Sequence, residues 1–180
     1  NRFHHALLLW GQKGLAKKEF AQLLVKSLLC HSKTLKACDL CQGCHWFDKG
    51  VHPDFINLEP LKDKKNINVE QIRHLQGKLS LTISAKTPRV ILIKSAEKMN
   101  LSASNALLKS LEEPVDNTIY ILISEGLASL PATIQSRCKK IFFPPLSKTQ
   151  LQSYLEKEGS PTDNLSLLNG SPLLAKDYLS

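Results

Sequence analysis

The chain has 180 residues, of which 42% are hydrophobic, enough to bury the core of one main domain with a small appendage. No apolar stretch approaches the roughly 20 residues that cross a bilayer, and the N-terminus carries no secretory signal pattern, so we expect a cytoplasmic protein rather than a membrane or secreted one. The net charge of +8 favours an anionic partner such as DNA, although a solvated lysine-rich surface explains it equally well.

Strand and helix patterns alternate along the first 143 residues. Short apolar runs predict strands at 6–10, 54–58, 89–93, 118–123 and 140–143. Apolar residues at helical spacing predict helices at 17–29, 69–81, 102–111 and 132–136. The unbroken run Val90-Ile91-Leu92-Ile93 fits a strand that is buried on both faces. The predicted fold class is therefore α/β, with a mostly parallel sheet and helices on both of its faces.

Two adjacent prolines, Pro144 and Pro145, end this alternation. The segments 147–157 and 164–179 have helical patterns, and no strand pattern follows the prolines. We therefore expect a small, all-helical second domain from about residue 146 to residue 180.

Residues 11–18 have the frame of a phosphate-binding loop of the form G-x-x-x-x-G-K-[ST]. Gly11, Gly14 and Lys17 are candidate phosphate-binding residues. Ala16 replaces the second glycine, which lets backbone N–H groups approach the phosphates, and Lys18 replaces the hydroxyl that holds Mg²⁺. The loop is therefore interpreted as vestigial, and no ATP binding, or only weak binding, is expected.

A hydrolysing enzyme of this class also needs a carboxylate pair after a buried strand. After the strand 89–93, Lys94 stands where the metal-binding acid is expected and Ser95 where the base is expected. Glu97 follows two positions later, and only a shifted register would bring it into the site. Two independent sets of residues have thus changed together, so we expect no ATP hydrolysis by this chain alone.

Four of the five cysteines, Cys30, Cys38, Cys41 and Cys44, lie within fifteen residues. Two-residue spacers let a tight turn direct neighbouring thiolates at one ion, and four thiolates complete a tetrahedral Zn²⁺ shell. With four soft ligands and no open position, a structural zinc is favoured over a catalytic one. The bound metal would stabilise a loop that has few apolar side chains of its own.

Other readings of the cysteines stay open. Free thiols, a disulfide or an iron–sulfur cluster are the alternatives, although the cysteine-proline end of ferredoxin motifs is absent. His31, His45 or His52 could replace Cys30 as fourth ligand, but each is better interpreted as a surface or loop histidine. Cys138 is expected to be a small buried thiol.

Several features together resemble the clamp-loader subunits of bacterial DNA polymerase III, over essentially all 180 residues. They are Arg2-Phe3-His4-His5-Ala6, the cysteine insert after the first helix, His52-Pro53-Asp54, the run from Asn105 to Pro114, and Ser136-Arg137-Cys138. The resemblance implies an AAA+ domain of P-loop type at residues 1–145, with a zinc insert at 30–52. It also implies a helical lid domain at 146–180, incomplete here, and a collar domain that lies beyond this chain.

Within that family the chain resembles the delta prime type of subunit rather than the ATP-hydrolysing gamma/tau type. The lid motif Gly170-Ser171-Pro172-Leu173 agrees, because Leu173 stands where the active type has a phosphate-sensing arginine. The resemblance makes Arg137 an arginine finger, a catalytic residue that acts in trans in the ATP site of a neighbouring gamma subunit.

The same resemblance implies partners and a task. The partners are gamma/tau and delta subunits in a hetero-pentamer, within a DNA-directed DNA polymerase (nucleotidyltransferase) holoenzyme. The complex loads the sliding clamp on primed DNA during replication, and this subunit serves as a comparatively rigid stator that is not itself an enzyme. The alternatives are an active gamma/tau-type ATPase and a zinc-dependent nucleic-acid-binding module.

Overall fold

The computed structural model describes residues 4–32, 36–62, 64–79, 87–157 and 170–173. Its strands form one parallel five-stranded sheet in the order β2-β3-β4-β1-β5. The strands are β1 (Ala6–Trp10), β2 (Phe55–Leu58), β3 (Arg89–Ile93), β4 (Thr118–Ser124) and β5 (Lys139–Phe142). The predicted strands are confirmed, with ends displaced by no more than one residue.

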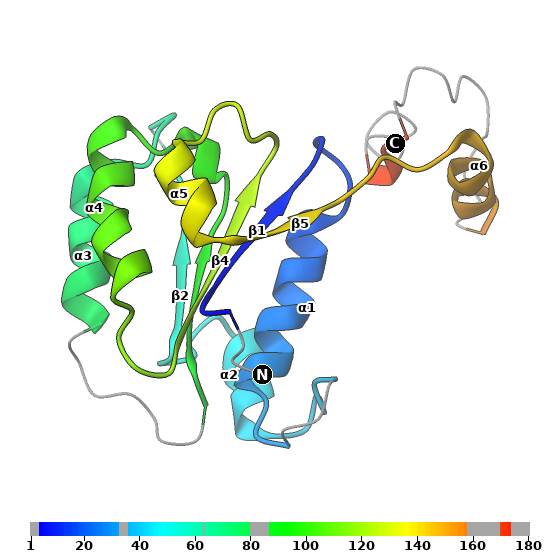
Figure 1. Cartoon of the computed structure of the whole chain (residues 1–180). Coiled ribbons are helices and arrows are strands. Elements are labelled where there is room, and N and C mark those ends of the chain that lie inside the picture. Colours follow the sequence, from blue (N-terminus) through cyan, green and yellow to red (C-terminus); the bar gives the residue numbers. More distant parts are fainter. Residues whose placement is uncertain (1–3, 33–35, 63, 80–86, 158–169, 174–180) are drawn as a thin grey trace.

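Helices cover both faces of this sheet, as predicted. The described helices are α1 (Lys17–Leu29), α2 (Gln42–Asp48), α3 (Val69–Leu79), α4 (Leu101–Glu112), α5 (Ala132–Arg137) and α6 (Lys148–Lys157), with a 3₁₀ turn η1 (Ala96–Lys98), and α6 lies apart from the sheet (Figure 1). Figure 1 shows α1 and α2 on one side of the sheet and α3, α4 and α5 on the other. The sequence missed α2 and η1, because seven and three residues are too few to reveal a helical period. The predicted end of α3 at residue 81 lies outside the described residues.

The two faces of the sheet are filled by alternate residues of the same strands. In β3, Ile91 and Ile93 join the core beneath α3, α4 and α5, whereas Val90 and Leu92 join the core beneath α1. All five residues of β3 are buried. Because neighbouring side chains of a strand point to opposite faces, a continuous apolar run marks a strand covered on both sides.

Polar residues define where two of the core helices begin. Asn100 precedes α4, and its side chain accepts a hydrogen bond of 2.8 Å from the Ala103 N–H. Before α3, Asn68 and Gln71 bond reciprocally to each other's backbone N–H, at 3.0 and 3.2 Å. Such caps satisfy the free N–H groups of a first turn. Helix α1 differs, because Ala16 offers no side-chain cap.

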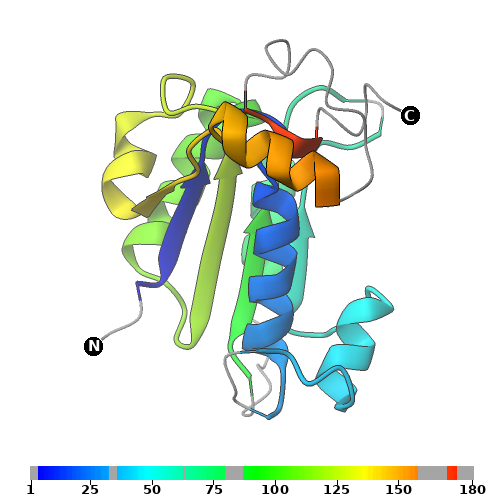
Figure 2. The ribbon, with the colours of Figure 1, turned by 90° about the vertical axis from the view of Figure 1, so that its right-hand side faces the viewer.

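The residues after the two prolines have a small apolar cluster of their own. Leu151 and Leu155 of α6 are buried and pack with Leu146 and Tyr154. Figure 2 shows α6 in front of the N-terminal end of α1, and the side view of Figure 1 shows the two helices well apart. The predicted helix at 164–179 lies outside the described residues, except for residues 170–173. No helix in the described part of the chain is long and apolar enough to span a membrane.

Candidate functional site

The loop between β1 and α1, the candidate phosphate loop, has three residues with positive φ. Ala16 stands in the glycine position and adopts the left-handed conformation, with φ 55° and ψ 25°. Gly14 has φ 80° and Gly11 has φ 150°. A Cβ atom on Gly11 would lie 2.4 Å from the backbone oxygen of Phe143, so this glycine is required by a close approach of two backbones.

Lys17 turns back into its own loop. Its side chain is only 5% exposed, and Nζ donates hydrogen bonds to the backbone oxygens of Gly11, at 2.6 Å, and Gln12, at 2.5 Å. Burial lowers the pKa of Lys17, while the carboxylates of Glu125 and Glu97 act in the opposite direction. The ammonium group thus lies against loop carbonyls rather than standing free above the loop.

A cavity of about 190 Å³ lies over this loop. It is lined by Lys13, Gly14, Ala16, Lys17, Lys18, Glu19, Ser95, Glu97, Ile123, Ser124, Glu125 and Leu173. Glu97 reaches this cavity, and its Oε2 atom is buried without a hydrogen-bond partner among the described residues. Sequence reasoning missed Glu125; its position directly after β4 was the available signal, because parallel strands end at the same edge of a sheet.

The residues that follow β3 divide between two environments. Ser95 lines the cavity, whereas Lys94 is absent from its lining and forms an ion pair of 3.3 Å with Glu59. Position 94 therefore offers the cavity neither a carboxylate nor a cation, and position 95 offers only a hydroxyl.

The lid motif contacts the phosphate loop directly. The Leu173 N–H donates to the oxygen of Gly14 at 3.2 Å, and the Ser171 hydroxyl donates to the oxygen of Lys13 at 2.8 Å. Leu173 also lines the cavity, so this position contributes an apolar side chain where a phosphate would need a cation. The sequence placed Leu173 beside the site correctly.

The four predicted cysteines come together at the far end of α1. Their sulfur atoms all lie within 4.8 Å of one another, with Cys30 Sγ at 3.5 Å from that of Cys38 and 3.8 Å from that of Cys41. Four ligands at the Zn–S distance of about 2.3 Å around a tetrahedral ion would be about 3.8 Å apart. The group therefore fits a metal ion of this kind, and none of the five cysteines forms a disulfide.

The electrostatic surroundings favour thiolates at two of these positions. Burial would raise the pKa of Cys30, but hydrogen bonds from Ser32 and the Cys38 N–H outweigh it and lower this pKa to about 6. At Cys41 the N–H groups of Cys44 and His31 likewise outweigh burial and lower the pKa. Burial raises the pKa of Cys44 to about 12. Metals bind cysteine as the thiolate, and a lowered pKa favours the thiolate, so Cys30 and Cys41 are suited to act as metal ligands.

The histidines do not belong to this cluster. His52 lies in the loop before β2, in agreement with its interpretation as a surface or loop residue, but it is buried there: it is only 5% exposed and its ring lies edge-on to Trp46, with 5.8 Å between centroids. Its Nδ1 accepts the Asp54 N–H at 3.1 Å, and burial lowers the pKa of His52. The metal-binding group contains Cys30 and no histidine among the described residues. Cys138 is buried, as predicted.

Arg137 lies at the end of α5 and is not part of the cavity lining. Its guanidinium donates to the Thr133 oxygen at 2.8 Å and the Ser136 hydroxyl at 3.3 Å, and it forms an ion pair with Glu112. About a third of its side chain is exposed. The guanidinium can therefore meet a group from outside this chain.

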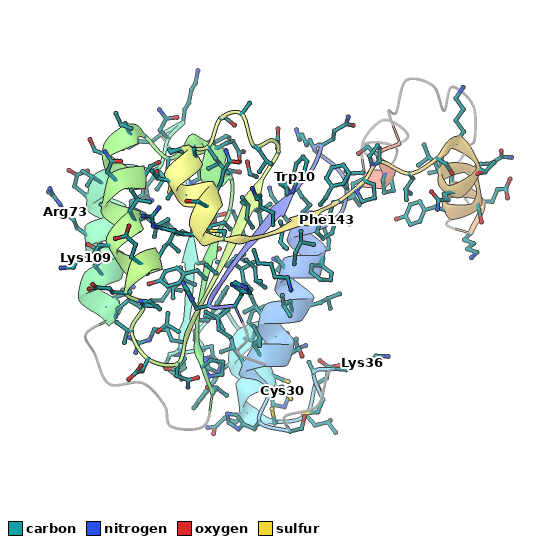
Figure 3. The ribbon with its side chains drawn as sticks, in the orientation of Figure 1. Trp10, Cys30, Lys36, Arg73, Lys109 and Phe143 are labelled. Atoms are coloured by element: carbon teal, nitrogen blue, oxygen red, sulfur yellow. The ribbon has the colours of Figure 1, made fainter. Side chains whose placement is uncertain are left out.

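The cavity and the cysteine cluster thus occupy opposite ends of α1, whose thirteen residues span about 20 Å. Figure 3 shows Cys30 at one end of this helix, and Trp10 and Phe143 beside the other.

Residues 1–147 match the family described as "DNA polymerase III, delta subunit". A protein of Pseudomonas aeruginosa named "DNA polymerase III subunit delta'" is 37% identical, over 96% of this chain and 55% of its own length. A "DNA polymerase III subunit gamma" of Buchnera aphidicola is 34% identical, over 86% of this chain and 42% of its own. The chain therefore spans about half the length of the curated relatives it matches.

Solved structures agree on the fold. A gamma subunit-related protein of Thermotoga maritima has a TM-score of 0.64 at 20% identity, and the match covers 97% of this chain and 53% of that one. At this identity the likeness speaks for the fold alone, and it confirms the predicted AAA+ type of α/β architecture.

Proposed function

Because the chain belongs to the delta subunit family of DNA polymerase III, we propose that it is the N-terminal part of a delta prime clamp-loader subunit that does not hydrolyse ATP itself. It supplies Arg137 to the ATP site of a neighbouring gamma/tau subunit, and through that complex, which includes a delta subunit, it helps to load the sliding clamp on primed DNA. One observation carries the proposal: a partly exposed arginine stands at the end of α5, while the loop before α1 has Ala16 and Lys18 where a phosphate loop would have a glycine and a hydroxyl.

Three features of the cavity and its surroundings argue against turnover by the chain itself. Its volume of about 190 Å³ is below the roughly 300–1,000 Å³ of usual ligand pockets. Lys17 is bonded to loop carbonyls, and Lys18 takes the place of the hydroxyl that would hold Mg²⁺. Lys94 pairs with Glu59 where a metal-binding acid would be needed. Each of these changes opposes a different requirement of hydrolysis.

The proposed role of Arg137 follows from the charge of its side chain. A guanidinium stays protonated and offers N–H groups in a planar fork that suits phosphate oxygens. When ATP in the neighbour is hydrolysed, negative charge is redistributed over the transferring phosphoryl group, and an arginine from across the interface stabilises it. Such an arginine needs no nucleotide in its own subunit.

We assign a structural zinc ion to Cys30, Cys38, Cys41 and Cys44. When bound, the ion would cross-link the end of α1 to α2, with no position left open for a substrate. We further propose that the chain consists of an AAA+ domain at residues 1–145, with the zinc insert at 30–52, and a lid domain that begins at residue 146.

The assignment of Arg137 is tested in the full-length protein, reconstituted with gamma/tau and delta subunits, clamp and primed DNA. Arg137→Ala should lower hydrolysis at the adjacent ATP site by roughly a thousandfold, which reduces total turnover by that site's share. Arg73→Ala is the matched control, because Arg73 is an exposed arginine on α3. Unchanged turnover with Arg137→Ala would refute the role.

The active gamma/tau type remains the second candidate, and two observations favour it. Ala16 keeps the left-handed conformation of the glycine it replaces, and Glu97 reaches the cavity. This candidate predicts magnesium-dependent ATP turnover by the purified full-length subunit alone. Turnover confined to the assembled complex would exclude it.

A further inference from the structure

Arg137 and Glu112 are the last residues of two helices that pack on the same core. Glu112 ends α4 and Arg137 ends α5, and their side chains form an ion pair between Nη2 and Oε1. Leu111 and Ile134, one position and three positions earlier in the two helices, are both buried in that core. The packing of α4 against α5 therefore sets the two charged groups side by side.

We propose that Glu112 is a positioning residue for Arg137, an inference that rests on the proposed arginine finger. The guanidinium is held on two sides, with Nη1 bonded to Thr133 and Ser136 and Nη2 paired with Glu112. A long arginine side chain has many rotamers in solution, and a catalytic group that is already oriented loses less freedom when it engages a phosphate. Glu112 supplies the part of this orientation that comes from a different helix.

The hydrogen count of the guanidinium distinguishes positioning from blocking. Each Nη atom carries two N–H groups and Nε carries one. Nη1 donates to Thr133 and Ser136, and Nη2 is the atom that pairs with Glu112. Nε donates to no group among the described residues, and Nη2 has two N–H groups and one carboxylate partner there, so an incoming phosphate can bind without displacing Glu112. The carboxylate therefore holds the finger in place during the reaction.

The ion pair lies at the surface, so its effect on the orientation of Arg137 can be tested without a large change in the stability of the domain. The side chains of Arg137 and Glu112 are 32% and 48% exposed. Exposed ion pairs contribute little to folding, so removing Glu112 should leave the domain folded. Glu113 is the matched control, because it is the adjacent, exposed glutamate and forms no ion pair with the described residues.

The experiment measures ATP hydrolysis by the reconstituted complex that contains the full-length subunit. Glu112→Ala should lower kcat at the adjacent site by roughly tenfold without changing KM for ATP, because it disturbs a group that acts in the transition state. Glu112→Gln should restore most of this loss, since its amide oxygen still accepts an N–H. Glu113→Ala should match the wild type, and thermal unfolding should show every variant folded.

A double variant tests whether Glu112 acts through Arg137. In the Arg137→Ala background, Glu112→Ala should cause no further loss, because its target is gone. A further loss of the same size there, or unchanged or faster turnover with Glu112→Ala alone, would overturn the positioning role. So would a Glu112→Gln variant as slow as Glu112→Ala. If Arg137→Ala itself leaves turnover unchanged, the proposed function fails, which is a distinct result.

Discussion

The two ends of α1 carry two different candidate sites, one marked by its backbone conformation and the other by its side chains. At its N-terminal end, the loop interpreted as a vestigial phosphate loop has Ala16 in the left-handed conformation that a glycine would adopt easily, and two residues of the phosphate-loop pattern are replaced. At its C-terminal end the four cysteine side chains are all present and converge within 4.8 Å, on a segment with a helix of only seven residues. Figure 2 shows both ends along the same helix.

The difference has a physical reason in what holds each region together. The loop is fixed by backbone contacts: the Gly11 N–H bonds to Ser124, the Phe143 N–H bonds to Trp10, and the Leu173 N–H bonds to Gly14. Such contacts hardly depend on which side chains the loop carries, so the loop can hold its conformation when its side chains are replaced. The cysteine segment, in the proposed zinc assignment, would be held by the metal, because each thiolate would supply part of the ion's shell.

Removal of the proposed metal is expected to have the largest effect, and to affect only the cysteine segment at the C-terminal end of α1. A chelator, or Cys44→Ser, should lower the zinc content from about one per chain to zero and speed hydrogen exchange across residues 38–52, because small zinc sites draw on the order of 10 kcal/mol from metal binding. Exchange in β1 and β4 should change little. Cys138→Ala, which alters a buried thiol outside the cluster, should keep its zinc. Protein purified without zinc would contradict the assignment.

Gly11→Ala should destabilise the other end. The new Cβ would meet the Phe143 oxygen at 2.4 Å, at a φ of 150° that side chains rarely adopt. We expect a loss of about 2–4 kcal/mol in the free energy of unfolding, measured by urea denaturation, with the zinc content unchanged. Gly126→Ala, where a Cβ would meet nothing within 4 Å, should cost less than about 0.5 kcal/mol. Equal effects of the two substitutions would show that backbone contacts do not hold the loop.

Ala16→Gly should have the smallest effect, and it should raise the free energy of unfolding rather than lower it. A left-handed conformation costs a non-glycine residue about 1–2 kcal/mol, and glycine's greater freedom in the unfolded chain returns about 0.4–1 kcal/mol of that. The net result should be a gain of roughly 0.5–1 kcal/mol in the free energy of unfolding. A loss of stability would mean that the Ala16 methyl group packs usefully, and that the loop has adapted to its new side chain.

The features that the sequence predicted well were those with a regular local pattern. The strand 89–93 could be found, and assigned to a doubly covered sheet, because Val90 to Ile93 is continuously apolar. The short helix α2 could not, since its residues show cysteine spacing rather than a helical period. The burial of His52 within its loop could not be predicted, because it depends on Trp46 and Asp54, which the sequence does not show to be packed around it.

The sequence by itself determined the order of the strands and of the longer helices, the cysteines that come together and the departures from the phosphate-loop pattern, because each depends on residues at neighbouring positions. The tertiary structure alone decided that Lys17 bonds to its own loop, that Glu97 and Glu125 share the cavity, and that Glu112 pairs with Arg137. These contacts join segments that meet only when the sheet forms. Their geometry follows from helix and strand packing, which no local pattern records.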